Sequence, residues 1–156
     1  MLEYEICKMT TDAEMDEKGF VHWQAWHETY TGLMPNEYLN TVTVEKCVKI
    51  AHKFPQNTLL LKINHKTVGF SCISKSVDIN EIIAIYLLKE YHGMKLGYEL
   101  LKHTISLFAD NNPIVLWVLK GNERAMRFYQ KAGFEFTGNE KACSFGIELQ
   151  MKMKKI

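Results

Sequence analysis

Near the start of the chain, apolar residues first alternate with charged ones and then recur every three or four positions. The alternating residues are Leu2, Tyr4 and Ile6, and the recurring ones are Phe20, Trp23, Trp26 and Tyr30. Alternation predicts a half-buried strand, and the longer spacing predicts an amphipathic helix with N-cap candidates at residues 10–12. After a break at residues 32–35, which contains a glycine and a proline, residues 38–50 predict a second, weaker helical region.

The middle of the chain is rich in apolar and β-branched residues. Residues 58–63 and 68–74 predict two strands joined by a hairpin turn, and residues 81–87 predict a third strand. The third strand is apolar on both faces, which indicates a central position in a sheet. A helical stripe then predicts a helix that begins at Leu96 and ends near Pro113.

The last third of the chain predicts a strand at residues 114–119, a helix and two closing strands. The helical stripe consists of Ala125, Phe128, Tyr129 and Ala132. Asn122 is a suitable N-cap for this helix, and Gly133 is suitable just beyond its C-terminal end. The closing strands, 134–137 and 143–153, are joined through Gly138 and Asn139. The predicted order is β-α-α-β-β-β-α-β-α-β-β, an α/β (α+β) fold.

Length and charge narrow the class of protein. The chain has 156 residues, of which 47% are hydrophobic, so we expect a single domain over residues 1–156. Nineteen basic and 18 acidic side chains leave a formal charge of +1, which predicts no nucleic-acid partner and no membrane-binding patch. The first residues do not resemble a secretory signal, and the apolar run 82–88 is too short to span a bilayer. We therefore expect a cytoplasmic protein.

The cysteines and histidines show no spacing typical of a metal site. The four cysteines are Cys7, Cys47, Cys72 and Cys143, and no two of them form a CxxC pair. Distant cysteines in a cytoplasmic protein are typically reduced thiols. The sequence therefore predicts neither a disulfide framework nor a bound metal.

The turn after the central strand, EYHGMKLG at residues 90–97, is a candidate binding site. The N-terminus of a helix exposes unpaired N–H groups and the positive end of the helix dipole, which favours an anion such as phosphate. Gly93 and Gly97 allow a ligand to come close, and Lys95 adds a positive charge. The turn matches neither the dinucleotide fingerprint nor the P-loop. On its own it is equally compatible with a tight connection that needs glycine for geometry alone.

Two segments together resemble the GNAT superfamily of N-acetyltransferases. HGMKLG resembles the R/Q-x-x-G-x-G/A turn of that superfamily, and NERAMRFYQKAGF at residues 122–134 matches N-x-x-A-x-x-F-Y-x-x-x-G-F residue for residue. The resemblance implies a GNAT fold, with a single mixed, mostly antiparallel sheet flanked by helices, and an acetyl-CoA-dependent acyltransferase. His92 stands where Arg or Gln is usual, and Lys95 stands where the first glycine is usual. Lys95 either weakens cofactor binding or points to a phosphate.

The resemblance also implies where acetyl-CoA binds. The implied cofactor-binding residues are Ile85, Tyr86, Leu87, His92, Gly93, Met94, Lys95, Leu96, Gly97, Tyr98 and Asn122. The turn would hold the pyrophosphate. Backbone N–H groups of residues 85–87 would polarise the thioester carbonyl, as donors in an oxyanion hole do.

Two side chains are candidates for proton transfer. The resemblance implies that Tyr129 is the general acid for the CoA thiolate, although this residue can also pack in the core. Glu81 lies where some members of the superfamily place a catalytic glutamate. The alternatives are a solvated carboxylate and deprotonation of the amine through water. The superfamily transfers the acetyl group directly, so the cysteines need no catalytic role.

Trp26 and Tyr30 are the candidates for substrate binding. Aromatic faces beside Glu28 are suited to a cationic amine, whereas their helical spacing also fits a core-facing stripe. The near-neutral charge favours a small-molecule primary amine as the acceptor. The alternatives are a protein N-terminus or lysine, a non-catalytic acetyl-CoA-binding module, and a fold relative that has lost the cofactor. The oligomeric state is open, and a homodimer is one alternative.

Overall fold

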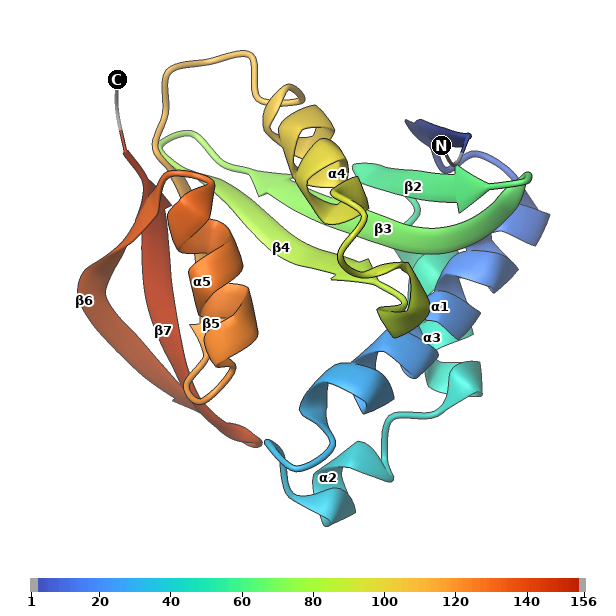
Figure 1. Ribbon diagram of the computed structural model, residues 1–156, viewed down its shortest axis with the longest axis horizontal. Helices are drawn as coiled ribbons and strands as arrows, with labels where there is room; N and C mark the ends of the chain where they lie inside the picture. Colours follow the sequence, from blue (N-terminus) through green and yellow to red (C-terminus); the bar gives the residue numbers. More distant parts are fainter. Residues whose placement is uncertain (1–2, 155–156) are drawn as a thin grey trace.

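The computed structural model describes residues 3–154, so Leu2 of the predicted first strand lies outside the described residues (Figure 1). The strands are β1 (Tyr4–Lys8), β2 (Thr58–Ile63), β3 (Lys66–Lys75), β4 (Asn80–Leu87), β5 (Ile114–Leu119), β6 (Phe134–Cys143) and β7 (Gly146–Met153). Within the described residues they form one sheet in the order β1-β2-β3-β4-β5-β7-β6. Strands β4 and β5 are parallel and the other neighbours are antiparallel. The predicted mixed, mostly antiparallel sheet is confirmed.

The helices connect the strands and cover both faces of the sheet. They are α1 (Asp12–Tyr30), α2 (Asn36–Leu39), α3 (Val44–Lys53), the 3₁₀-helix η1 (Lys89–Tyr91), α4 (Leu96–Ile105) and α5 (Glu123–Lys131). On β3, Phe70 contacts His22 of α1, and its neighbour Ser71 bonds to Thr104 of α4 at 2.7 Å. Adjacent strand residues point to opposite faces, so α1 covers one face and α4 the other. No helix within residues 3–154 is long and apolar enough to cross a membrane.

A capping box and an ion pair fix helix α1 against the sheet. Thr11 accepts a hydrogen bond from the N–H of Glu14, and the Glu14 carboxylate accepts one from the N–H of Thr11. The same carboxylate lies 2.7 Å from Nζ of Lys62 on β2. The ammonium of Lys62 and the backbone donors lower the pKa of Glu14 to about 2. The start of α1 is therefore held to β2.

The prediction of a single helical region at residues 38–50 is wrong, because the chain forms two helices there. Helix α2 ends at Leu39, and α3 begins after Thr43, whose backbone is extended with φ −111° and ψ 161°. The Thr43 hydroxyl accepts a hydrogen bond from the N–H of Lys46. This N-cap starts a new helix and interrupts the one predicted across it.

The prediction that Gly138 and Asn139 form the closing hairpin turn is also wrong. Strand β6 continues through both residues to Cys143, and the pairing with β7 shifts register between Phe136 and Glu140. The side-chain amide of Asn139 donates to Oε1 of Gln150 on β7 at 2.9 Å. Gly138, with φ +90°, therefore belongs to a β-bulge, and the turn lies at residues 144–145.

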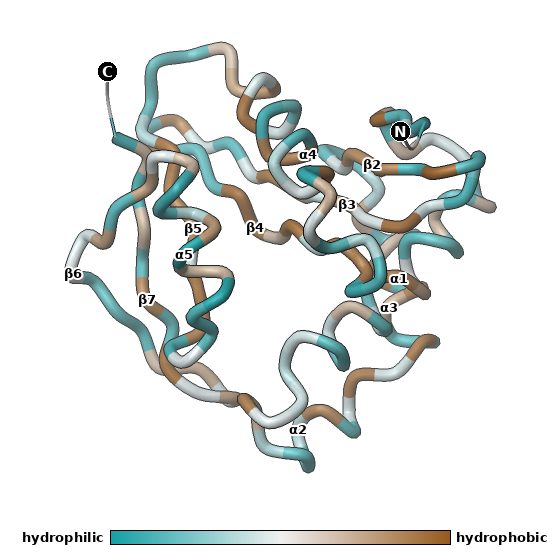
Figure 2. The backbone as a smooth tube through the Cα atoms, viewed as in Figure 1, coloured by the Kyte–Doolittle hydropathy of each residue, from teal (hydrophilic) through white to brown (hydrophobic). Residues whose placement is uncertain are grey.

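Apolar residues are concentrated where the helices meet the sheet. Figure 2 shows much of β2 to β5 in brown and the outer turns largely in teal. Fully buried residues include Leu60, Phe70 and Leu100 in the part of the core where α1 and α4 pack on the sheet, and Leu116 and Met151 in the part beside α5. The two halves of the core meet around β4 and β5, which is where the candidate site lies.

Candidate active site

Strands β4 and β5 pair at one end only. Residues 80–82 of β4 lie opposite residues 114–116 of β5, and among the described residues no pairing between these strands continues beyond Ile82. The N–H of Leu88 donates to O of Val68 on β3 at 3.0 Å. Because backbone groups alternate in direction along a strand, Ile85 and Leu87 turn their N–H groups away from β3 and toward the open edge. Of the three backbone N–H groups that were predicted to polarise the thioester carbonyl, those of residues 85–87, two therefore face the space between β4 and β5.

A cavity of about 780 Å³ lies along this open edge. Its walls come from the end of α1, the edge of β4, the turn before α4, strand β5 and the start of α5. The predicted site residues that line it are Tyr30, Ile85, Tyr86, Leu87, His92, Gly93, Lys95, Gly97, Tyr98, Asn122 and Tyr129. The volume lies within the usual range for small-molecule and cofactor sites.

Four predicted site residues lie outside the described lining of this cavity: Trp26, Glu81, Met94 and Leu96. Glu81 pairs with Ser74 and Val115 in the continuous part of the sheet, so the structure does not bring it to the open edge. Leu96 is buried in the core, and Met94 is exposed. The side chains of residues 94 and 96 do not line the cavity, but their backbone amides belong to the segment that precedes and begins α4.

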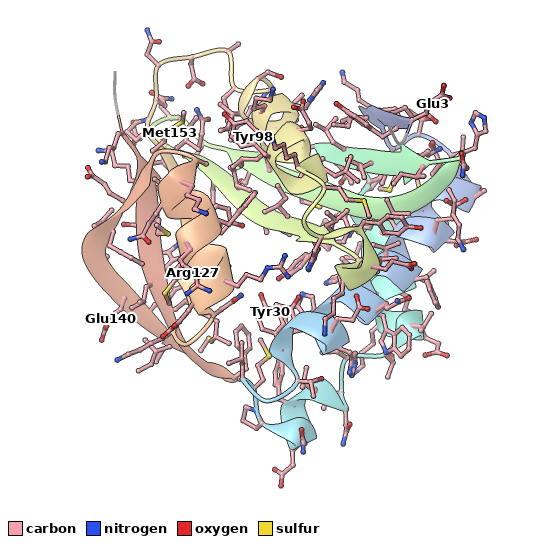
Figure 3. All side chains as sticks on the ribbon, viewed as in Figure 1. Glu3, Tyr30, Tyr98, Arg127, Glu140 and Met153 are labelled. Atoms are coloured by element: carbon pink, nitrogen blue, oxygen red, sulfur yellow. The ribbon has the colours of Figure 1, made fainter. Side chains whose placement is uncertain are left out.

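Trp26 belongs to an aromatic cluster behind the site. Its ring centroid lies 5.0 Å from that of Tyr30 and 5.8 Å from that of Phe145, the residue at the turn between β6 and β7. Phe145 also packs on Tyr38 of α2, with centroids 5.0 Å apart. Trp26 is therefore half-buried in this cluster and lies outside the described lining of the cavity. Tyr30, at the end of α1, reaches the cavity (Figure 3).

The turn before α4 presents unpaired backbone donors. Glu99 is the first residue of α4 whose N–H bonds to a preceding carbonyl, that of Lys95, at 3.1 Å. The N–H groups of residues 96–98 therefore have no partner within the helix. Lys95 is the N-cap and has φ +62° and ψ 7°, the left-handed region that glycine adopts without steric cost. A lysine thus occupies a backbone conformation that a glycine would adopt more easily.

His92 connects the turn to the end of β4 and to α5. Its Nε2–H donates to the carbonyl oxygen of Leu87 at 2.8 Å, since a carbonyl oxygen only accepts. Its Nδ1 accepts a hydrogen bond from Nη1 of Arg124. Burial lowers the pKa of His92, so the ring is neutral at pH 7 and Nδ1 is free to accept.

Three phenol groups meet at the cavity. The hydroxyls of Tyr30 and Tyr86 are hydrogen-bonded at 2.8 Å, and Tyr129 lines the same space from α5. Burial raises the pKa of Tyr129, and nearby Tyr30 adds to the shift. Burial likewise raises the pKa values of Tyr30 and Tyr86. All three hydroxyls are therefore protonated at neutral pH. Within the Tyr30–Tyr86 pair one hydroxyl donates to the other, whereas the hydroxyl of Tyr129 remains available as a donor to a ligand.

Asn122 sets the start of α5 and hence the position of Tyr129. Its side-chain oxygen accepts a hydrogen bond from the N–H of Ala125 at 3.3 Å, as the sequence predicted for an N-cap. Sequence reasoning missed other lining residues, above all Arg124 and Trp117. A cation in the first turn of a helix opposes the helix dipole, and this is the signal that could have drawn attention to Arg124.

Comparisons with known proteins agree with this architecture. The model of the acetyltransferase (GNAT) family matches residues 20–134. Over 76 residues the chain is 33% identical to proteins named as uncharacterized N-acetyltransferases from Mycobacterium tuberculosis and Mycobacterium bovis. The alignment covers 47% of this chain and 49% of each relative, so it spans about half the length of the curated relatives.

Solved structures share the fold over nearly the whole chain. The PaiA N-acetyltransferase of Thermoplasma acidophilum, in complex with coenzyme A, has a TM-score of 0.80 at 21% identity, over 99% of this chain and 100% of that one. Naa50 of Arabidopsis thaliana, in complex with a bisubstrate CoA analogue, has a TM-score of 0.65 at 21% identity, over 97% and 99%. A ribosomal-protein alanine N-acetyltransferase of Escherichia coli has a TM-score of 0.71 at 16% identity, over 97% and 93%.

The predicted GNAT fold and the predicted superfamily are both confirmed. The splayed strands, the turn before α4 and the N-x-x-A-x-x-F-Y segment of α5 all lie within the matched residues 20–134. The chain belongs to the acetyltransferase (GNAT) family.

Proposed function

We propose that the protein transfers the acetyl group of acetyl-CoA directly to a primary amine of a small molecule. One observation carries this proposal: the open amides of Ile85 and Leu87, the donor-rich turn before α4 and the hydroxyl of Tyr129 line one cavity. The complexes of PaiA with coenzyme A and of Naa50 with a CoA analogue support the choice of cofactor.

The chain offers a separate group of donors for each part of the cofactor. The N–H groups of residues 96–98, at the positive end of the α4 dipole, would bind the pyrophosphate. The open edge of β4 would hydrogen-bond the amides of the pantetheine arm. The N–H groups of Ile85 and Leu87 would also polarise the thioester carbonyl, where negative charge develops during attack.

Acetyl transfer needs a neutral amine and a stabilised leaving thiolate. The amine nitrogen forms a bond to the carbonyl carbon, the carbon–sulfur bond breaks, and the amine loses a proton. Tyr129 would donate a hydrogen bond to the departing sulfur, whose thiol has an ordinary pKa of about 8.5. Because burial raises the pKa of Tyr129, its hydroxyl is present as a donor throughout the neutral range. With Glu81 in the paired part of the sheet, we expect water to carry the amine proton away.

The far end of the site favours a small acceptor. The β6–β7 turn reaches the α1–α2 connection (Figure 1), and Phe145 packs there on Trp26 and Tyr38. An extended peptide that approached between these segments would have to displace that aromatic contact. A protein amine is the second candidate, supported by the name of the Escherichia coli relative.

The test combines binding with turnover. Calorimetric titration with acetyl-CoA, with ATP as a control, measures cofactor binding, and thiol release measures transfer to a panel of small amines and to peptides with free N-termini. We expect micromolar binding and turnover with small amines. Tyr129→Phe should bind acetyl-CoA as the wild type does and lose about 10²- to 10³-fold in kcat.

Each other result points to a different function. Turnover with peptides alone would assign a protein acceptor. Binding without turnover on either panel would indicate an acetyl-CoA-binding module, and no binding at millimolar acetyl-CoA would mean that the fold has lost its cofactor.

A further inference from the structure

Arg124 places a positive charge at the start of α5, where it does not stabilise the helix. It lies in the first turn of α5, where the positive end of the helix dipole repels it, and it lines the cavity. Among the ion pairs of residues 3–154, none contains Arg124. The nearby carboxylate of Glu123 lies 3.7 Å from Arg127 instead. Arg124 therefore holds a full positive charge on the cavity wall without a carboxylate partner.

His92 directs this charge toward the turn before α4. Since Nε2–H of His92 donates to Leu87, the neutral ring offers Nδ1 as the acceptor for Arg124. This hydrogen bond joins two segments: Arg124 belongs to α5, which follows β5, and His92 belongs to the segment that follows β4. It therefore connects the two strands that separate beyond Ile82. A neutral imidazole fixes the direction of the guanidinium but leaves its charge uncompensated.

The turn beside His92 departs from its family pattern at two positions, 92 and 95. The side chain at position 92, usually Arg or Gln, is here a histidine that is uncharged and already bonded to the Leu87 carbonyl. Position 95, usually glycine, carries a lysine that forms no side-chain cap with α4. The remaining donors are the backbone N–H groups of residues 96–98, which carry no net charge. The ammonium of Lys95, which also lines the cavity, is then the only charged side chain that the turn itself offers, and a diphosphate with two negative charges can accept a second cation from α5.

We propose that Arg124, positioned by His92, binds the pyrophosphate of acetyl-CoA. A guanidinium suits this ligand because its planar donors match phosphate oxygens in a bidentate manner. His92 acts as a positioning residue, and Arg124 takes the place of the basic or amide side chain that position 92 usually provides. This inference rests on the proposed cofactor.

The test compares two arginines on the same helix. Arg124→Ala and Arg127→Ala each remove one guanidinium from α5, where Arg127 is labelled in Figure 3. Calorimetry should give a dissociation constant for coenzyme A that rises about 10-fold or more in Arg124→Ala and less than 2-fold in Arg127→Ala, because hydrogen bonds to charged groups are the stronger class. Dephospho-CoA, which keeps the pyrophosphate and lacks the 3′-phosphate, should show the same loss.

The role of His92 has its own readout. In His92→Gln, the amide nitrogen can donate to Leu87 and the amide oxygen can accept from Arg124, so affinity should stay within about 3-fold of the wild type. His92→Ala should weaken binding, and the double variant with Arg124→Ala should bind no more weakly than Arg124→Ala alone, since both changes remove one contact. Melting temperatures of the unliganded variants show whether each one is folded.

Several outcomes would overturn the inference. Equal affinities of folded Arg124→Ala and Arg127→Ala would remove Arg124 from the site. A loss seen with coenzyme A and absent with dephospho-CoA would place Arg124 at the 3′-phosphate instead. Additive effects of the two single changes would separate His92 from Arg124. Failure of the wild type to bind coenzyme A at all would instead refute the proposed function.

Discussion

At the scale of single residues, His22 is a half-buried base in an aromatic environment. Its ring lies 5.5 Å from Phe70, 5.9 Å from Trp26 and 6.3 Å from Tyr86, between centroids. Within the described residues, its buried Nδ1 has no hydrogen-bond partner. Burial lowers the pKa of His22 to about 4, and the positive charge of Lys18 adds to the effect. The folded protein therefore keeps this ring neutral.

The lowered pKa predicts a loss of stability in mild acid. Between pH 6.5 and pH 4 the unfolded chain takes up a proton at His22 that the folded chain does not, so the free energy of unfolding falls as the pH falls. The expected contribution of His22 between pH 7.5 and pH 5 is about 2 kcal/mol. Urea unfolding at both pH values, for the wild type and for His22→Phe, measures it.

The pKa of His92 is also lowered, so His92 also decreases the free energy of unfolding as the pH falls. Comparing the wild type with His22→Phe separates the contribution of His22 from that of His92. His22→Phe should lose clearly less stability than the wild type over this range. An equal loss in both proteins would show that the acid sensitivity arises at other groups.

At the scale of secondary-structure elements, the start of α4 carries backbone strain. Lys95 adopts φ +62°, a conformation that costs an L-residue about 1–2 kcal/mol and costs glycine nothing. Lys95→Gly should therefore raise the free energy of unfolding by about 1 kcal/mol, which thermal or urea unfolding can measure.

Lys95→Ala is the matched control, because it removes the ammonium group and keeps the backbone strain. If the ammonium helps to bind phosphate, both variants should lose the same affinity for acetyl-CoA, and only the glycine variant should gain stability. A glycine variant no more stable than the alanine variant would contradict the assignment of strain to this position.

The limits of a helix or strand could be predicted from the sequence where they depend on residues that are close together in the chain. The N-cap at Asn122 and the residue after the helix, Gly133, bracket α5 as predicted, because capping involves neighbours in the chain. The bulge at Gly138 was not predictable, since it depends on Gln150 of the opposite strand. Glycine and asparagine favour a turn or a bulge equally well, and only the cross-strand contact decides between them.

The same limit applies to the candidate site. The turn at residues 92–97 and Tyr129 were predicted from motifs, each of which is a continuous segment. The contact between His92 and Arg124 joins residues far apart in the chain, and no periodic pattern encodes it. Glu81 was assigned from its place in a strand, but the pairing of that strand with β5 keeps it from the open edge.

At the scale of the whole molecule, the sheet consists of two parts joined over a short distance. Strands β1 to β4 form one part and β5 to β7 the other, and they pair at residues 80–82 and 114–116. If acetyl-CoA binds along the open edge, it should protect the amides that face this edge. Those of Ile85 and Leu87 should exchange hydrogen more slowly when acetyl-CoA is present, as NMR or mass spectrometry can measure.

Tyr86 provides the internal control, because its N–H faces β3 in both states. Its exchange should change only as much as the global stability does. Protection of all three amides to the same degree would indicate general stabilisation by a ligand bound elsewhere. No change at Ile85 and Leu87 under saturating cofactor would exclude the open edge as the binding site.

The short junction between the two halves has a mechanical consequence. The pantetheine arm of a bound cofactor would hydrogen-bond to the free edge of β4 and pack against α5. It would thereby connect the two parts of the sheet where β4 and β5 do not pair with each other. The stiffness of the scaffold would then rise and fall once in every catalytic cycle. A ligand that binds only the folded form also shifts the unfolding equilibrium, so resistance to proteolysis would follow the supply of cofactor. The lifetime of the protein would thus depend on the abundance of its own substrate.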